Sequence, residues 1–224
     1  MDRRLLLLVV AVVALVGVVN ATVYAYRWMT GNITIAGPSG VTGAACTGFY
    51  AADNRDPNMP NVGTNYNAQT YGGNIISVTP GDVVCNWTKD ETEYKLYESI
   101  EVTIPITVGS WYIQDFYGFG YYGTDEDPTV YVYFRLEDDA TDGSYLSTAK
   151  LIVYKVSGST TTLVDQYNLL SNSGTQWYIT SLSPGDALRL DLRFDAAESG
   201  RVSFRIGVYV TQEANEAPSN PPNP

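Results

Sequence analysis

The feature that most constrains the fold is a strict alternation of apolar and polar residues in the last third of the chain. Apolar residues occupy every second position from Val202 to Val210, and the same pattern runs from Leu188 to Phe194. Alternation with period 2 is typical of a β-strand that buries one face. The turn sequence AAESG separates the two segments, so we expect them to form a β-hairpin that closes a sandwich.

The middle of the chain predicts further strands. They are expected over residues 75–78, 96–108, 111–122, 130–137, 151–156, 162–168 and 177–182. In the second of these, inward positions are Leu96, Ile100, Val102, Ile104, Ile106 and Val108. The strands 151–156 and 162–168 flank the turn VSGST as a hairpin. Because no amphipathic helix is predicted, the expected fold is all-β, a jelly-roll β-sandwich of about ten antiparallel strands over residues 36–212.

Two Pro-Gly-Asp sequences predict turns at related places. Pro184-Gly185 fits a type II turn, in which glycine supplies the positive φ, and Asp186 follows it. The same triplet occurs earlier as Pro80, Gly81 and Asp82. Each turn could end one strand and start another at matching corners of two sheets.

Residues 1–25 have the pattern of a secretory signal peptide. Charged residues at 2–4 precede an apolar run from Leu5 to Val19, which is short for a bilayer span. Cleavage after Ala25 is favoured over cleavage after Ala21, and an uncleaved anchor from Leu5 to Ala25 is the alternative. The protein is therefore expected to be secreted, with residues 213–224 as a flexible Pro/Asn-rich tail.

Export has consequences for cysteine and asparagine residues. Cys46 lies in a Gly- and Asn-rich segment, 36–74, and Cys85 follows the first Pro-Gly-Asp turn. We expect a disulfide that fixes this long segment, with two free buried thiols as the alternative. Asn32 and Asn86 begin N-glycosylation sequons and are the expected glycosylation sites. Asn86 is the stronger expectation, because Asn32 would be inaccessible if the strand that contains it were buried in a neighbouring subunit.

Composition excludes several classes of function. The formal net charge of −11 over 224 residues disfavours nucleic acid as a partner. The sequence has no histidine, which removes the commonest general base and zinc ligand. Neither an HExxH nor a GxSxG motif is present. We therefore expect no catalytic residue, no metal site and no enzymatic activity.

The acidic residues leave two weaker interpretations open. Among Asp115, Asp125 and Asp127, two carboxylates could form a catalytic acid pair. All three lie in turn-like stretches, so carboxylates of solvent-exposed loops are the better explanation. Residues 125–127 and 137–139, the second with Asp142, could bind Ca²⁺ through oxygen ligands. Their spacing matches no Ca²⁺ loop motif, so Ca²⁺ is the weaker alternative and no cofactor is the expectation.

Residues 26–35 form an aromatic segment that can adopt a strand. Tyr26 and Trp28 lie on one face and Met29 on the other, while Ile33 and Ile35 continue the apolar pattern. Taken alone, the segment is best explained as the first strand of the domain. The alternative is a strand that is donated to a neighbouring subunit.

Four short motifs carry a resemblance: VYAYRW (23–28), VTPGD (78–82), SPGD (183–186) and VSFRIGVYVTQEANE (202–216). Together they resemble camelysin/TasA-like secreted biofilm matrix proteins, and among these the archaeal bundling-pilus subunits. The resemblance implies a jelly roll that polymerises head to tail by donor-strand complementation, with residues 26–35 as the donor strand. It further implies a structural subunit of a cell-surface filament, whose partners are identical subunits and laterally bundled filaments. The insert 36–74 departs from the sequence pattern of that family.

A secreted carbohydrate-binding module is a second class of function. Its support is the aromatic stretch from Trp111 to Tyr122 together with the outward positions of Tyr131 and Tyr133. Such aromatic residues would serve a glycan or a subunit interface equally well. Glycans are therefore an alternative partner.

Overall fold

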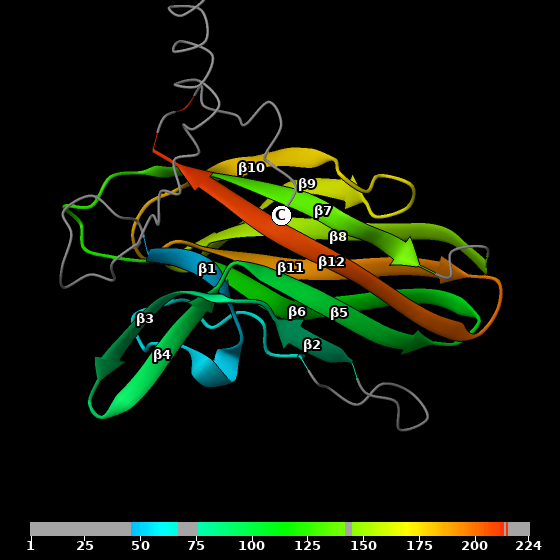
Figure 1. Ribbon diagram of the computed structural model, residues 1–224, viewed down its shortest axis with the longest axis horizontal. Helices are drawn as coiled ribbons and strands as arrows, with labels where there is room; N and C mark the ends of the chain where they lie inside the picture. Colours follow the sequence, from blue (N-terminus) through cyan, green and yellow to red (C-terminus); the bar gives the residue numbers. More distant parts are fainter. Residues whose placement is uncertain (1–45, 67–75, 142–144, 213, 215–224) are drawn as a thin grey trace, which may run out of the picture. The chain divides into compact units, whose positions relative to one another are not determined.

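A computed structural model describes residues 46–66, 76–141, 145–212 and 214 (Figure 1). The expected signal peptide, the donor strand 26–35, Asn32 and most of the tail lie outside these residues. The described residues form two antiparallel sheets packed as a β-sandwich, with a short 3-10 turn at Ala52–Asn54, so the all-β prediction is confirmed. The jelly-roll assignment stays a prediction. None of the described residues forms a helix long and apolar enough to cross a membrane.

The two sheets contain twelve strands in the described part of the chain, against about ten predicted. The seven-stranded sheet has the order β3-β4-β1-β6-β11-β8-β9, with β1 (Cys46–Tyr50), β3 (Val83–Lys89), β4 (Thr92–Tyr97), β6 (Gly109–Tyr122), β8 (Leu146–Ser157), β9 (Thr160–Asn168) and β11 (Ala187–Ala196). The five-stranded sheet has the order β10-β7-β12-β5-β2, with β2 (Ser77–Pro80), β5 (Ser99–Ile106), β7 (Val130–Thr141), β10 (Gln176–Leu182) and β12 (Gly200–Thr211).

The main core lies between the inner faces of the two sheets. Phe49 of β1 and Phe119 of β6 meet edge to face with ring centroids 5.2 Å apart. Phe134 of β7 approaches them from the other sheet, at 5.3 Å from Phe49 and 5.4 Å from Phe119. All three side chains are fully buried, and each such burial stabilises the fold by roughly 1.5–3 kcal/mol. The alternation in β7 and β12 is therefore explained by one face that packs on this core.

Strands β11 and β12 do not form the predicted hairpin. β11 lies in the seven-stranded sheet between β6 and β8, whereas β12 lies in the five-stranded sheet between β5 and β7. The prediction was wrong because alternation fixes which face of a strand is buried and not which strand pairs with it. The predicted hairpin across the VSGST turn is confirmed, because β8 and β9 pair directly.

The predicted strand 96–108 is two strands in different sheets. Glu98 lies between β4 and β5, where its backbone N–H donates to the Asp82 carbonyl and its carbonyl accepts from the Val208 N–H, both at 3.0 Å. Val108 was predicted to face inward but is 62% exposed, because it follows the end of β5. The other predicted inward positions of this segment are buried.

Both Pro-Gly-Asp turns carry the chain from the five-stranded to the seven-stranded sheet, from β2 to β3 and from β10 to β11. Each turn therefore follows a strand of one sheet and precedes a strand of the other. Gly185 has a φ of 82°, as a type II turn requires. Gly81 serves close approach instead, because a Cβ there would lie 2.1 Å from Ser99 Oγ. Asp186 forms an ion pair with Lys155 at 2.9 Å.

A second apolar cluster lies on the outer face of the seven-stranded sheet. Its buried members are Cys46, Tyr50, Met59, Val62, Cys85, Leu96 and Ala187. Glycines of β6 make room for it: a Cβ at Gly120 would lie 2.4 Å from Met59 Cε, and one at Gly118 would lie 2.7 Å from Val62 Cγ2. The glycines of the aromatic stretch therefore allow segment 51–66 to pack on the sheet.

The predicted disulfide between Cys46 and Cys85 is present in this cluster. The two Cα atoms lie 5.7 Å apart, and the bond joins β1 to β3 on either side of β4. It thereby closes the long segment between the first and third strands.

Asp56 anchors segment 51–66 from within. Its side chain is fully buried and accepts hydrogen bonds from the Asn58 N–H at 2.8 Å, Trp87 Nε1 at 3.0 Å and Lys89 Nζ at 3.3 Å. Burial alone would raise the pKa of this carboxyl. The three donors and the charge of Lys89 outweigh burial and hold the pKa below its ordinary value.

Replacing both cysteines with alanine should lower the free energy of unfolding by about 4 kcal/mol, because the bond closes a loop over a sequence separation of 39 residues. Denaturant titration of the two proteins measures the difference. The reduced wild-type protein should behave like the double variant. A loss below about 1 kcal/mol would contradict the expected contribution.

Asp56→Asn should lower the free energy of unfolding at pH 7 by about 1.5–3 kcal/mol, since hydrogen bonds to a charged group are lost. A carboxyl with a depressed pKa contributes stability above its unfolded pKa of about 3.9 and loses that contribution as the pH falls through the folded pKa. The difference from wild type should therefore shrink below about pH 4. Denaturant titrations across pH test this, with Asp90→Asn at an exposed turn position as the control. A difference that is constant with pH would contradict the role of the charge.

Candidate functional site

Three tyrosines from neighbouring strands form a row on the outer face of the five-stranded sheet. Tyr133 is in register with Tyr178 of β10 on one side and with Tyr209 of β12 on the other. The ring centroids lie 5.3 Å and 6.0 Å from that of Tyr133. Val132 and Phe134 on either side of Tyr133 are fully buried in the core, so the tyrosines face outward. We call these three residues the tyrosine row.

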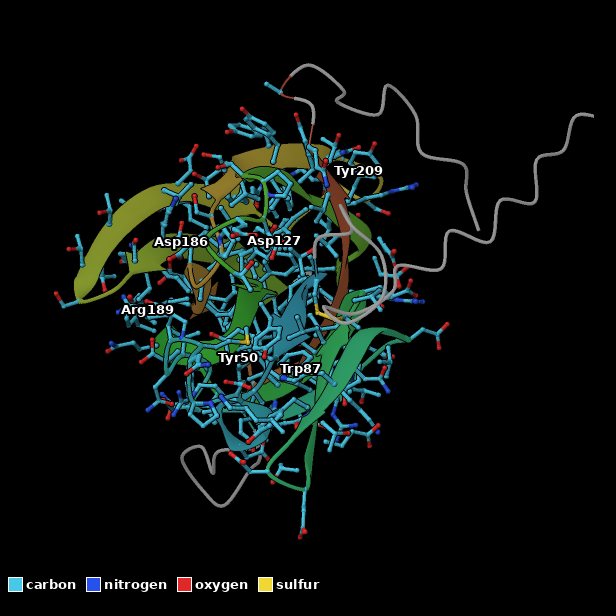
Figure 2. The ribbon with its side chains drawn as sticks, turned by 90° about the vertical axis from the view of Figure 1, so that its left-hand side faces the viewer. Tyr50, Trp87, Asp127, Asp186, Arg189 and Tyr209 are labelled. Carbon is cyan, nitrogen blue, oxygen red and sulfur yellow. A yellow bond between two sulfur atoms is a disulfide. The ribbon has the colours of Figure 1, made fainter. Side chains whose placement is uncertain are left out.

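The two outer members of the row are the accessible ones. Tyr178 is 51% exposed and Tyr209 is 37% exposed, while Tyr133 between them is 6% exposed. Partial burial, with smaller contributions from Tyr133 and Tyr131, raises the pKa of Tyr178. Its hydroxyl is therefore protonated at neutral pH and can donate a hydrogen bond. Figure 2 shows Tyr209 on the opposite side of the sandwich from Arg189.

Polar residues lie next to the row on the same face. Gln176, Arg135 and Gly207 occupy the neighbouring register positions of β10, β7 and β12. Glu137 and Arg205 form an ion pair at 2.7 Å beside them. A Cβ at Gly207 would lie 2.5 Å from Glu137 Oε1, so this glycine leaves space for the carboxylate. An accessible aromatic surface thus adjoins charged and amide groups.

The aromatic residues that the sequence predicted to form an exposed surface differ in their exposure. Tyr131 lies on the outer face beside the row, in register with Thr211. In the stretch from Trp111 to Tyr122, however, Tyr112 is 54% exposed, while the buried residues include Phe116, Tyr117, Phe119 and Tyr121. The stretch as a whole is not an exposed surface, because β6 is a central strand covered by the core on one face and by segment 51–66 on the other. Tyr178 and Tyr209 are not marked as site residues by any local sequence pattern, since cross-strand register brings them together.

Asp115 lies beside Asp191 and Arg189. Its backbone N–H donates to Asp191 Oδ1 at 2.9 Å, and Arg189 Nε lies 3.0 Å from Asp115 Oδ1 and 3.3 Å from Asp191 Oδ1. Burial raises the pKa of the Asp115 carboxyl, an effect that Arg189 opposes. Asp115 has a φ of 52° at an irregularity in the pairing of β6 with β11. The cluster therefore holds a local distortion of the sheet.

Asp191 is fully buried and so cannot reach a substrate directly. The Tyr112 hydroxyl donates to Asp191 Oδ2, and the Arg189 guanidinium lies 4.1 Å from the centre of the Tyr154 ring. The carboxylate is thus satisfied from within the sheet. We assign this cluster a structural role.

The acidic residues considered for Ca²⁺ have other contacts. Asp127 accepts the Thr124 N–H at 2.7 Å within its own turn, Glu137 forms the ion pair described above, and Asp139 accepts a backbone N–H at 2.6 Å. Asp142 lies outside the described residues. Across the described ranges, no group of three or more histidine, cysteine or acidic residues is placed to hold a metal ion.

Asn86 is exposed on β3, at one edge of the seven-stranded sheet. Its side-chain amide donates to Glu93 Oε1 at 3.2 Å. The position is accessible to modification from solvent, and glycosylation of Asn86 stays a prediction.

No family model and no curated protein matches this sequence. Among solved structures, the chain is similar to TmCBM61, solved in complex with β-1,4-galactotriose, with a TM-score of 0.30, 10% identity and coverage of 62% of this chain and 82% of that one. It is also similar to the enzymatically active domain of tailspike protein 4 of bacteriophage CBA120, with a TM-score of 0.27 and 12% identity. That match covers 65% of this chain and 20% of the tailspike chain. Similarities this low carry no argument about function.

Proposed function

We propose that the protein binds carbohydrate through the tyrosine row, without catalysis. The observation that carries this proposal is the register of Tyr178, Tyr133 and Tyr209 on an outer sheet face. Tyrosine offers an apolar ring and a hydroxyl, which suits a ligand that has both apolar faces and hydroxyl groups. Because Tyr133 is nearly buried, it fixes the positions of its neighbours, and the ligand contacts Tyr178 and Tyr209.

The surroundings of the row support a sugar over other partners. The ion pair between Arg205 and Glu137 lies on the same face and is partly exposed, so these charged groups can orient a ligand with hydroxyls. The net charge of −11 opposes the binding of polyanions such as nucleic acid. A neutral or weakly charged glycan is therefore the ligand that this face fits best.

Replacing Tyr178 or Tyr209 with alanine should weaken binding to a polysaccharide about tenfold, or roughly 1.4 kcal/mol, because one ring contact is lost. The double variant should show no retention. Affinity electrophoresis in gels that contain neutral β-linked polysaccharides measures the effect. Tyr178→Phe should keep most of the affinity, since the ring remains.

Leu163→Ala is the matched control, because Leu163 is 49% exposed on β9 of the other sheet. Its retention should equal that of the wild-type protein. If Leu163→Ala and the double tyrosine variant bind alike, or if the wild-type protein binds no polysaccharide of the panel, the tyrosine row is not a glycan site.

A second candidate function is that of a secreted filament subunit of the camelysin/TasA-like kind. The observation that favours it is β9, a nine-residue edge strand of the seven-stranded sheet whose side chains are mostly exposed. It contains neither proline nor lysine, which commonly protect edges against pairing with another chain. An edge of this kind can accept a strand from another copy, and residues 26–35 would supply that strand.

Deletion of residues 26–35 should prevent polymerisation if the second function holds. Trp28→Ala should weaken assembly more than Arg27→Ala, since burial of the larger apolar side chain contributes roughly 1.5–3 kcal/mol. Negative-stain electron microscopy of the purified protein without glycan detects filaments. Filaments of normal diameter from the deletion variant would contradict a donated strand. Monomers of the wild-type protein that bind polysaccharide would favour the first function.

A further inference from the structure

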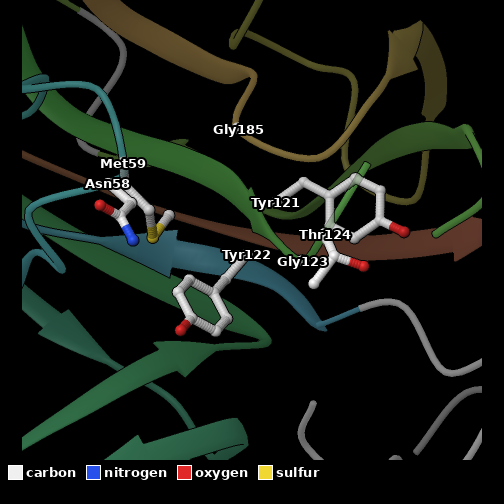
Figure 3. Close-up of a pocket in the computed structure, with 7 residues that line it drawn as sticks. All are labelled: Asn58, Met59, Tyr121, Tyr122, Gly123, Thr124 and Gly185. Carbon is white, nitrogen blue, oxygen red and sulfur yellow. The ribbon is translucent and has the colours of Figure 1, made fainter. Parts of the chain in front are cut away.

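A pocket of about 190 Å³ lies where segment 51–66, the end of β6 and the second Pro-Gly-Asp turn meet (Figure 3). Asn58 and Met59 line it from the segment, Tyr122 and Thr124 from β6 and the turn that follows, and Gly185 from the Pro-Gly-Asp turn. Tyr122 is in register with Cys46, so the disulfide lies close by. The pocket is thus built from parts of the chain that other contacts already hold in place.

The aromatic wall of the pocket is fixed by stacking. The Tyr122 ring is nearly parallel to that of Trp87, at an interplanar angle of 16° and a centroid distance of 4.0 Å. Trp87 is in turn held by its hydrogen bond to the buried Asp56. Tyr94 continues the stack on Trp87 at 5.7 Å. A ring that is positioned in advance loses little freedom on binding a ligand.

The remaining walls combine apolar and polar groups. Met59 is buried and contributes an apolar surface, while Asn58 is exposed and carries an amide. The Thr124 hydroxyl donates to Asp127 Oδ2 at 3.1 Å and retains its oxygen as an acceptor. A Cβ at Gly185 would meet no atom within 4 Å, so this side of the pocket is open.

We propose that this pocket binds a single sugar ring at the end of a glycan. Its volume is well below the roughly 300–1,000 Å³ of sites that enclose drug-sized ligands, which restricts it to one small ring. The apolar surfaces of Tyr122 and Met59 fit the face of that ring, and Asn58 and Thr124 bind its hydroxyls. The choice of a sugar over another small polyol depends on the function proposed above.

The pocket is separate from the tyrosine row. Tyr122 belongs to the seven-stranded sheet, whereas the row lies on the outer face of the five-stranded sheet. In Figure 2, Asp127 and Asp186, which neighbour the pocket in the sequence, lie apart from Tyr209. The two sites can therefore be changed independently.

Calorimetric titration of the full chain with galactose, glucose and N-acetylglucosamine tests the pocket. At least one of them should bind saturably at concentrations up to about 50 mM. Asn58→Trp, which places a ring in the pocket, should lower the affinity at least tenfold. Thr124→Val removes one hydrogen-bonding group and should lower the affinity about three- to tenfold.

Asn61→Trp is the matched control, because Asn61 is exposed on the same segment and does not line the pocket. Its affinity for the monosaccharide should equal that of the wild-type protein. Thermal melting of each variant verifies that the fold is retained. No saturable binding of any of the three sugars, or equal affinities of Asn58→Trp and Asn61→Trp, would overturn the proposal.

The two proposals fail in different ways. If polysaccharide is retained through Tyr178 and Tyr209 but no monosaccharide binds, the pocket proposal is wrong and the tyrosine row stands. If a monosaccharide binds and Asn58→Trp abolishes its binding while no polysaccharide is retained, the row is wrong and the pocket stands. The double variant Tyr178→Ala and Tyr209→Ala should bind the monosaccharide as the wild-type protein does.

Discussion

The face-to-face packing of the two sheets is the constraint on which the rest of the structure depends. A strand that buries one face must present every second residue on the other. In β7, Val132 and Phe134 pack on the opposite sheet, and Tyr133 is consequently turned outward. On the seven-stranded sheet the same rule places Gly118 and Gly120 outward, where segment 51–66 packs on them. An accessible tyrosine row on one side and a covered face on the other follow from one inner core.

Period-2 alternation predicted the all-β class and most strands, because burial of one face leaves a local pattern. It could not predict pairing, and the expected hairpin between β11 and β12 is wrong for that reason. Val108 shows a related limit of the pattern. The alternation continues beyond Ile106, where β5 ends, so Val108 was predicted to face inward although it is exposed. The disulfide was predictable because Cys46 and Cys85 are the two cysteines of the chain. The covering of β6 by segment 51–66 was not, since it depends on contacts between residues far apart in the sequence.

The candidate site was predictable only in part. Alternation in β7 places Tyr131 and Tyr133 outward, and both are on that face. Tyr178 and Tyr209 join them through cross-strand register, which no local pattern contains. The buried carboxylates Asp56 and Asp191 were missed for a similar reason. Their burial depends on donors from other strands, Trp87 of β3 for Asp56 and Tyr112 of β6 for Asp191, and no local pattern contains these contacts.

The order in which strands enter the sheets has a consequence for how the chain becomes a folded protein. Within the described part, the β3–β4 and β8–β9 connections stay in one sheet, and each other connection between consecutive strands passes to the opposite sheet. β11 is an interior strand of the seven-stranded sheet and β12 is the middle strand of the five-stranded sheet, and they are the last two strands of the described part to be synthesised. A ribosome releases the N-terminal strands first, so β5 and β7 wait with unpaired edges until β12 inserts between them. Most of the sandwich can therefore form only after the chain is nearly complete, and its many distant pairings make that step intrinsically slow.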